Sequence, residues 1–222
     1  MLTNSGKAFK LEVLKILQEK YGAIYKNEVI NLQAGAWIRT VLVVAAVGVS
    51  GSGKTVTLEY LVSQLSAQGY KIGSIKHVHH KGFTMDKEGT NTWRYAKAGA
   101  KVIVAISPEE VAIIKKTEMP LDSLDQMTAL IKQEDLDIVF FEGFHRLIAK
   151  SADVPKIITA VDENGLKQTL EGTVEPILAI AGIVAQNSSS PTYGNIPIIK
   201  LPENGQKLVE LVKKYLTQNK TA

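Results

Sequence analysis

The feature that most constrains this chain is a glycine-rich segment at residues 48–55, which directly follows seven apolar residues at 41–47. Its order is Gly48-Val49-Ser50-Gly51-Ser52-Gly53-Lys54-Thr55, which satisfies the phosphate-loop pattern G-x-x-x-x-G-K-[ST]. The apolar run is typical of a strand that is covered on both faces of a parallel sheet. Apolar residues recur at helical spacing over 58–65, and Gly69 ends that segment. Strand, loop and helix in this order are the context that a phosphate-binding loop requires.

The residue types in this segment suit a polyphosphate ligand. Glycines let successive backbone N–H groups converge on phosphate oxygens, and the following helix adds the positive end of its dipole. Lys54 is expected to reach the β- and γ-phosphates, and the Thr55 hydroxyl to join the shell of a Mg²⁺ ion. The residues expected to bind the nucleotide are Gly48, Ser50, Gly51, Ser52, Gly53, Lys54 and Thr55.

Strand-like and helix-like segments alternate along the rest of the chain. Apolar runs of strand length occur near 71–78, 101–106, 111–114, 138–141, 157–161, 177–180 and 196–199, and amphipathic segments separate several of them. This alternation predicts an α/β P-loop NTPase fold, with a mostly parallel sheet and helices on both faces. Residues 1–39 are expected to form a helical extension, because apolar residues recur every four positions from Phe9 to Tyr21. Residues 40–222 are expected to form the nucleotide-binding domain.

Two acids flank the apolar run at 138–141, and only one of them can lie near the phosphates. Asp137 and Glu142 are separated by about 16 Å if the segment is extended at ~3.3 Å per residue. Parallel strands present their carboxyl ends to the ligand, which selects Glu142 as the catalytic, metal-side acid. Asp137 is then expected to be a surface acid at the opposite rim.

Three of the four histidines follow the second strand-like segment, in the order Lys76-His77-Val78-His79-His80. We expect Lys76 and His77 to contact the nucleotide. Alternation along an extended chain would put His77 and His79 on one face, which leaves a metal-binding role open. Asp86, in the loop beyond, is either a catalytic residue that reaches Mg²⁺ through water or a turn residue before Gly89.

Composition excludes several classes of function. The 222 residues contain no cysteine, which removes disulfides, thiolate metal sites and a cysteine nucleophile, and favours a cytoplasmic protein. The net charge of +4 does not by itself indicate nucleic-acid binding, and we expect none. The longest apolar run is far shorter than the ~20 residues that a membrane span needs, so we expect no membrane association.

The motifs together resemble the MobB-type molybdopterin-guanine dinucleotide biosynthesis proteins. The resemblance covers about residues 41 to 150 and rests on the phosphate loop, Ile75-Lys76-His77 with His79-His80, Asp86 with Gly89, Ala98-Gly99-Ala100 and Glu142-Gly143-Phe144. Asn91 stands where the family commonly carries an acid. The resemblance implies a homodimeric GTP-binding accessory protein with weak, Mg²⁺-dependent GTPase activity in molybdenum cofactor biosynthesis. Its partners would be the molybdenum cofactor nucleotidyltransferase and other molybdopterin-handling proteins.

Two other functions remain open from the sequence. A small-molecule kinase also uses a phosphate loop with an acid at a strand end, although an arginine-rich lid is not evident in this chain. A metallochaperone GTPase would use His77, His79 and His80 as ligands. The guanine-reading pattern Asn-Lys-x-Asp does not occur, so spacing alone does not identify the base.

Overall fold

The computed structural model describes residues 41–80, 82–118 and 122–221, so the helix expected within residues 1–39 lies outside the described residues. The described residues belong to one unit, Thr40–Ala222. The helical character of residues 1–39 stays a prediction.

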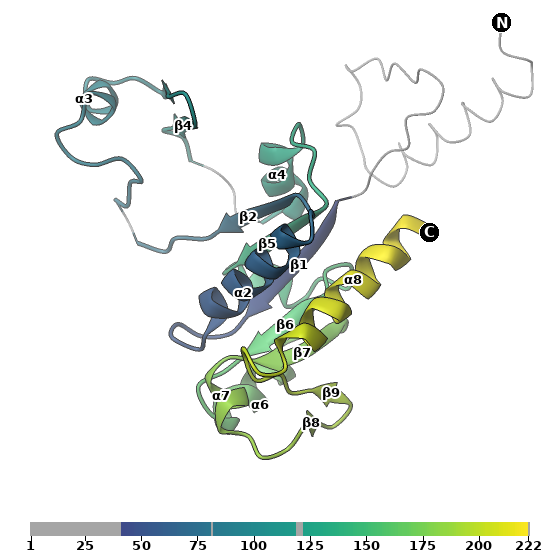
Figure 1. The fold of residues 1–222 in the computed structure, drawn as a ribbon. Helices are drawn as coiled ribbons and strands as arrows, with labels where there is room; N and C mark the ends of the chain where they lie inside the picture. The colour runs from purple at the N-terminus through teal and green to yellow at the C-terminus, as the bar shows by residue number, and fades with distance from the viewer. Residues whose placement is uncertain (1–40, 81, 119–121, 222) are drawn as a thin grey trace, which may run out of the picture. The chain divides into compact units, whose positions relative to one another are not determined.

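Five parallel strands form the central sheet of the described residues, in the order β2-β5-β1-β6-β7 (Figure 1). Their bounds are Leu42–Val47 (β1), Ile72–Lys76 (β2), Ile138–Glu142 (β5), Lys156–Thr159 (β6) and Ile177–Ala181 (β7). The apolar β1 lies in the middle, between β5 and β6. Because the strands are parallel, all five carboxyl ends lie at one edge, where β1 leads into the glycine-rich loop.

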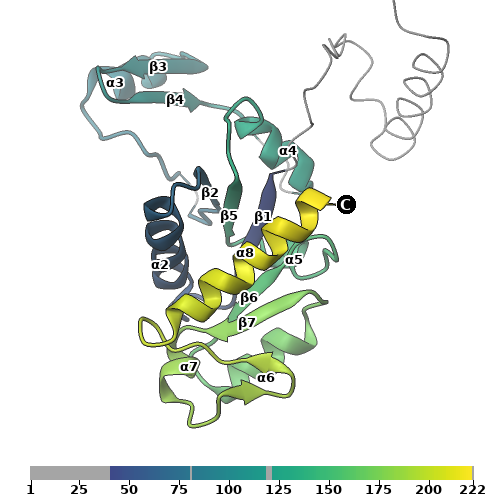
Figure 2. The ribbon, with the colours of Figure 1, turned by 45° about the vertical axis from the view of Figure 1, so that its right-hand side comes forward.

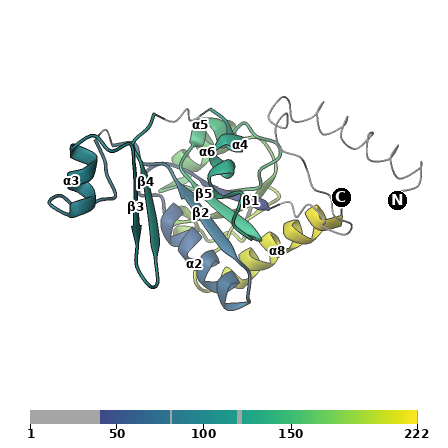
Figure 3. The same ribbon diagram turned by 90° about the horizontal axis from the view of Figure 1, so that it is seen from above.

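Helices cover both faces of this sheet, as predicted. One face carries α2 (Lys54–Ala67) and α8 (Gly205–Thr221). The other carries α4 (Leu124–Thr128), which continues into a 3-10 turn at Ala129–Ile131, together with α5 (His145–Ile148), α6 (Glu163–Glu171) and α7 (Ile183–Asn187). Figure 3 shows α2 and α8 on one side of the strands and α4, α5 and α6 on the other. Val44 packs with the first group and Ala45 with the second, which explains why β1 is continuously apolar.

A second sheet of two antiparallel strands is formed by β3 (Val102–Ile106) and β4 (Val111–Lys115), which follow α3 (Asn91–Lys97) (Figure 2). The strand character of both segments agrees with the sequence prediction, but neither joins the parallel sheet. Ile103, on one face of the hairpin, is buried. The opposite face exposes five aliphatic side chains: Val102, Val104, Ile106, Val111 and Ile113.

The strand expected at 196–199 is shorter than the apolar run suggested. Only Ile196–Pro197 (β9) forms a ladder, with Thr192–Tyr193 (β8), and Ile198 makes a single bridge to Ile180 of β7. Pro197 has no N–H group to donate, which limits how far the ladder can extend. In the described part of the chain, no helix has the length and apolar character that crossing a membrane demands.

Candidate nucleotide-binding site

The glycine-rich loop runs between the end of β1 and the start of α2. Gly51 and Gly53 have φ angles of 74° and 99°, a conformation that favours glycine over residues with a side chain. Ser52 is fully buried beneath the loop, where its hydroxyl donates a hydrogen bond to the Val49 carbonyl over 2.8 Å. The loop is therefore held from inside by one of its own side chains.

Two residues that sequence reasoning missed support the loop from neighbouring strands. The hydroxyls of Thr159, at the end of β6, and Ser52 lie 2.7 Å apart and share a buried hydrogen bond. A Cβ atom on Gly48 would lie 2.1 Å from the Thr159 carbonyl oxygen, and one on Gly182 would lie 2.1 Å from the Ser52 carbonyl oxygen. The Ile183 N–H donates to that same Ser52 oxygen over 3.1 Å. No local signal marks Thr159, because the predicted strand at 157–161 extends past it, and Gly182 lies just beyond the predicted strand at 177–180.

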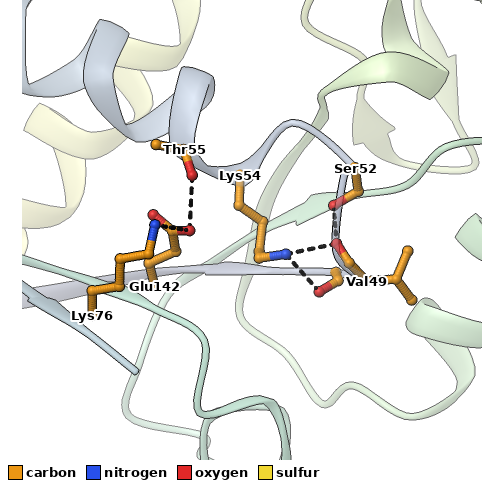
Figure 4. A network of polar contacts seen from close by, with 7 residues as sticks. Val49, Ser52, Lys54, Thr55, Lys76 and Glu142 are labelled. Carbon is orange, nitrogen blue, oxygen red and sulfur yellow. Dashed lines mark hydrogen bonds and ion pairs between the residues drawn. The ribbon is translucent and has the colours of Figure 1, made fainter. Parts of the chain in front are cut away.

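Lys54, the first residue of α2, folds back over the loop (Figure 4). Its ammonium group donates to the carbonyl oxygens of Gly48 and Val49 over 3.0 and 2.6 Å. Burial lowers the pKa of Lys54; Glu142 opposes this effect and Lys76 adds to it. The charged group thus lies at the mouth of the loop, and its contact with phosphate stays a prediction.

Glu142 ends β5 beside the loop, whereas Asp137 lies at the other end of that strand. One carboxylate oxygen of Glu142, Oε1, accepts a hydrogen bond from the Thr55 hydroxyl at 2.8 Å and pairs with the Lys76 ammonium at 3.0 Å (Figure 4). Lys76 is placed there because it is the register partner of Glu142 between β2 and β5. The structure therefore brings together Thr55, Lys76 and Glu142, the three polar residues that we expected near a metal ion and phosphates.

The prediction that Asp137 is a surface acid is wrong. Its side chain is buried, with 7% of its surface exposed, and its carboxylate accepts a hydrogen bond from the Lys71 N–H over 2.9 Å. Lys71 immediately precedes the neighbouring strand β2. A backbone donor on a neighbouring segment thus stabilises a buried carboxylate, which the sequence around Asp137 does not reveal.

The histidine segment that follows β2 packs against the turn that follows β5. The His77 ring stacks on Phe144 at a centroid distance of 4.9 Å and lies 4.0 Å from His79, so these two histidines do lie together. Gly143 and Phe144 have φ angles of 92° and 56°, and a Cβ on Gly143 would be 2.9 Å from that of His77. Burial, and then the neighbouring His79, lower the pKa of His77, whose Nδ1 is buried with no partner among the described residues.

One cavity of about 1030 Å³ joins these groups. Of the predicted nucleotide and metal residues, those that line it are Gly48, Ser50, Gly51, Gly53, Lys54, Thr55, Lys76, His77 and Glu142. Ser52 lies beneath the loop. The described residues contain no group of three histidine or acidic side chains arranged to hold a metal ion. The oxygen atoms of Thr55 and Glu142, 2.8 Å apart, are ligands of the kind that Mg²⁺ takes together with phosphates and water.

Asp86 does not line this cavity. One of its carboxylate oxygens accepts hydrogen bonds from the hydroxyls of Thr90 and Thr92, both at 2.9 Å, at the start of α3. Its other oxygen is buried without a partner among the described residues. These contacts match the turn role that the sequence left open, and a catalytic role for Asp86 stays a prediction.

Comparison with known proteins gives consistent matches. Residues 43–182 match the family model for molybdopterin guanine dinucleotide synthesis protein B (MobB). A molybdopterin-guanine dinucleotide biosynthesis adapter protein of Haemophilus influenzae is 36% identical over 134 residues, which make up 60% of this chain and 70% of that protein. The crystal structure of Bacillus subtilis MobB aligns with a TM-score of 0.62 and 25% identity, over 78% of this chain and 96% of that one.

A more distant similarity extends to an enzyme. A tetraacyldisaccharide 4'-kinase of Shewanella baltica is 27% identical over 122 residues, which make up 53% of this chain and 34% of that kinase.

Proposed function

Because the chain belongs to the MobB family of molybdopterin guanine dinucleotide synthesis proteins, we propose that it is a nucleotide-binding adapter in the biosynthesis of that dinucleotide. Its nucleotide is GTP, bound with Mg²⁺. One observation carries this proposal: the phosphate loop, Lys54, and the Thr55–Glu142 pair line a single cavity at the carboxyl edge of the parallel sheet. Adapter proteins of this name from other organisms support the biosynthetic role.

The proposed roles of the loop residues follow from their contacts. The N–H groups of residues 48–55 bind the phosphate chain, and Lys54 exchanges its bonds to the Gly48 and Val49 carbonyls for bonds to phosphate. Thr55 and Glu142 hold Mg²⁺, directly or through a coordinated water molecule. Lys76 neutralises Glu142 from the β2 side and reaches toward the nucleotide together with His77.

Hydrolysis of GTP is proposed to be weak. Glu142, the acid among the described residues that line the cavity, already accepts bonds from Thr55 and Lys76, so it organises the metal ion instead of serving as a free base. Asp86 would have to approach from its position at the start of α3 to take part. Phosphate release from GTP, measured with and without Mg²⁺, tests this activity.

The deciding experiment is a fluorescence titration with labelled GTP and ATP analogues. A clear preference for GTP would support the adapter proposal. A clear preference for ATP would favour the second candidate, a small-molecule kinase, for which the distant similarity to a tetraacyldisaccharide 4'-kinase is the specific observation. The metallochaperone alternative is less favoured, because the described residues hold no metal-binding group of histidines and acids.

Homodimerisation is also part of the proposal, and the β3–β4 hairpin supports it. A two-stranded hairpin is marginally stable alone. Five exposed aliphatic side chains on one of its faces form an apolar surface, and its exposure to water is unfavourable. A second copy of the chain would cover this face. Light scattering should give a dimer mass for the native chain and for Val174→Lys, and a monomer mass for Val104→Lys. A monomeric native chain would contradict this part of the proposal.

The remaining partners and the compartment are proposed on the same basis. The nucleotidyltransferase that attaches the nucleotide to molybdopterin, and other molybdopterin-handling proteins, are the partners that an adapter in this biosynthesis requires. The absence of cysteine from all 222 residues supports a cytoplasmic site of action. Affinity capture with the purified nucleotidyltransferase, with and without GTP, tests the partnership.

A further inference from the structure

The cavity extends well beyond the phosphate loop. The loop follows β1, the segment Gly143–Leu147 follows β5, and the segment His77–His80 follows β2, which is the outer neighbour of β5. Adjacent strands lie ~4.8 Å apart, so the end of β2 is about 10 Å from the end of β1. The cavity therefore has a near half at the phosphate loop and a far half formed by these two segments.

The far half carries one guanidinium group and several imidazole rings that can form hydrogen bonds. All four histidines of the chain line the cavity from these segments, together with Arg146. Glu142 is the only acidic side chain among the described residues that line the cavity, and its Oε1 is bonded to Thr55 and Lys76. Within the described residues, Arg146 makes no ion pair. The guanidinium charge of Arg146 in the far half is thus not paired with an acid of the described residues.

The one non-histidine aromatic ring in the described lining of the far half is largely covered. This ring, Phe144, is only 8% exposed, because it packs between His77 and Phe141. Phe144 therefore offers no open face for base stacking. On the near side, by contrast, Val56 of α2 exposes an apolar side chain to the cavity.

The cavity is large for a small-molecule site. Its volume of about 1030 Å³ lies at the upper end of the range of roughly 300–1,000 Å³ that small-molecule sites occupy. A guanidinium group and imidazole N–H donors are groups that bind phosphate oxygens, and arginine can bind two of them at once. Both the charge and the space therefore favour a second anionic ligand.

We propose that the far half binds the phosphate group of a second ligand, a phosphate monoester, beside the nucleotide held by the phosphate loop. Arg146 is the main anion-binding residue, and His79, His80 and His145 contribute further donors. His77, stacked on Phe144, keeps its proposed contact with the nucleotide. This inference rests on the proposed function, because the near half is assigned to the nucleotide.

Nuclear magnetic resonance can test the second site directly. Because all four histidines line the cavity, their imidazole ring signals report on it without further labelling of the site. The protein, saturated with Mg²⁺ and a non-hydrolysable GTP analogue, is titrated with glycerol 3-phosphate, and glycerol serves as the control that lacks phosphate. We expect saturable shifts with glycerol 3-phosphate and none with glycerol. Absence of saturable shifts would overturn the proposal.

Substitution of Arg146 separates the two halves of the cavity. Arg146→Gln should weaken binding of glycerol 3-phosphate about ten- to a hundredfold, as expected for loss of a charged hydrogen-bond donor. It should leave the affinity for the GTP analogue unchanged. Arg94→Gln, on α3 and outside the cavity, is the matched control and should change neither affinity. If Arg146→Gln weakens the GTP analogue and not glycerol 3-phosphate, the far half belongs to the nucleotide and the proposal is wrong.

Failure of the proposed function can be distinguished from failure of this inference. If the native chain does not bind the GTP analogue, the adapter proposal fails, and the titration is repeated without nucleotide on the native chain and on Lys54→Ala. Lys54→Ala should weaken phosphate binding at the loop, where the Lys54 ammonium lies. The second site stands if glycerol 3-phosphate binding then still depends on Arg146, and it falls if that binding depends on Lys54 alone.

Discussion

Replacement of Thr159 by valine tests whether β6 holds the phosphate loop in its binding conformation. Valine keeps the shape of threonine but removes the hydroxyl that shares a buried hydrogen bond with Ser52 and also lies 3.3 Å from the Val47 carbonyl oxygen. Ser52 would keep its bond to the Val49 carbonyl, so no buried donor is left unpaired. The expected loss of unfolding free energy is therefore that of one net hydrogen bond, about 1 kcal/mol.

Two measurements follow from this magnitude. The melting temperature should fall by about 2–4 °C, as expected for 1 kcal/mol in a domain of this size. Affinity for a GTP analogue should fall by up to about fivefold, if all of the lost free energy had served to order the loop. Calorimetry and the fluorescence titration described above provide both values.

Thr169→Val provides the matched control. Thr169 is also buried, but its hydroxyl donates to the Gly165 carbonyl within α6, away from the phosphate loop. The control should lower the melting temperature by no more than Thr159→Val and should leave nucleotide affinity unchanged. Equal nucleotide affinity in Thr159→Val and the native chain would show that the Thr159–Ser52 contact does not order the loop for its ligand, and the reasoning would then fail.

The other predictions concern charged residues. Calorimetric titration should show that Lys54→Ala binds triphosphate about ten- to a hundredfold more weakly, while the fold persists, because the ammonium group serves the ligand. An unchanged affinity would exclude the phosphate-loop assignment. Glu142→Gln should reduce Mg²⁺-dependent phosphate release, and its nucleotide affinity measured without metal should hold steady or rise. Glu59→Gln, on the exposed side of α2, is the control and should change neither value. Full activity in Glu142→Gln would remove Glu142 from the metal site. Burial lowers the pKa of Lys156, so the unfolded chain binds a proton at this side chain more readily than the folded chain does. The free energy of unfolding should therefore rise with pH between the lowered pKa and about 10.4. Urea titrations of Lys156→Met should lack this rise.

The phosphate loop and its surroundings could be predicted because their signals are local. An apolar run, glycines at fixed offsets and a helix pattern all lie within residues 41–69. The choice of Glu142 over Asp137 as the residue beside the loop followed from strand direction alone, since parallel strands share one ligand edge, and the contact between Glu142 and Thr55 agrees with it. The alternation of side chains likewise anticipated that His77 and His79 lie together.

Other features depend on which segments become neighbours, and local patterns do not encode that choice. The β3 and β4 segments have clear strand character, yet only the tertiary structure shows that they pair with each other and leave the parallel sheet. Asp137 is buried because the Lys71 backbone lies beside it, and Asp86 faces the hydroxyls of α3 and not the cavity. Thr159 and Gly182 are unremarkable in sequence. They support the phosphate loop because the strand order β1-β6-β7 brings two strand ends beneath it, and hydrogen bonds and steric contacts form only between groups that the fold has made adjacent.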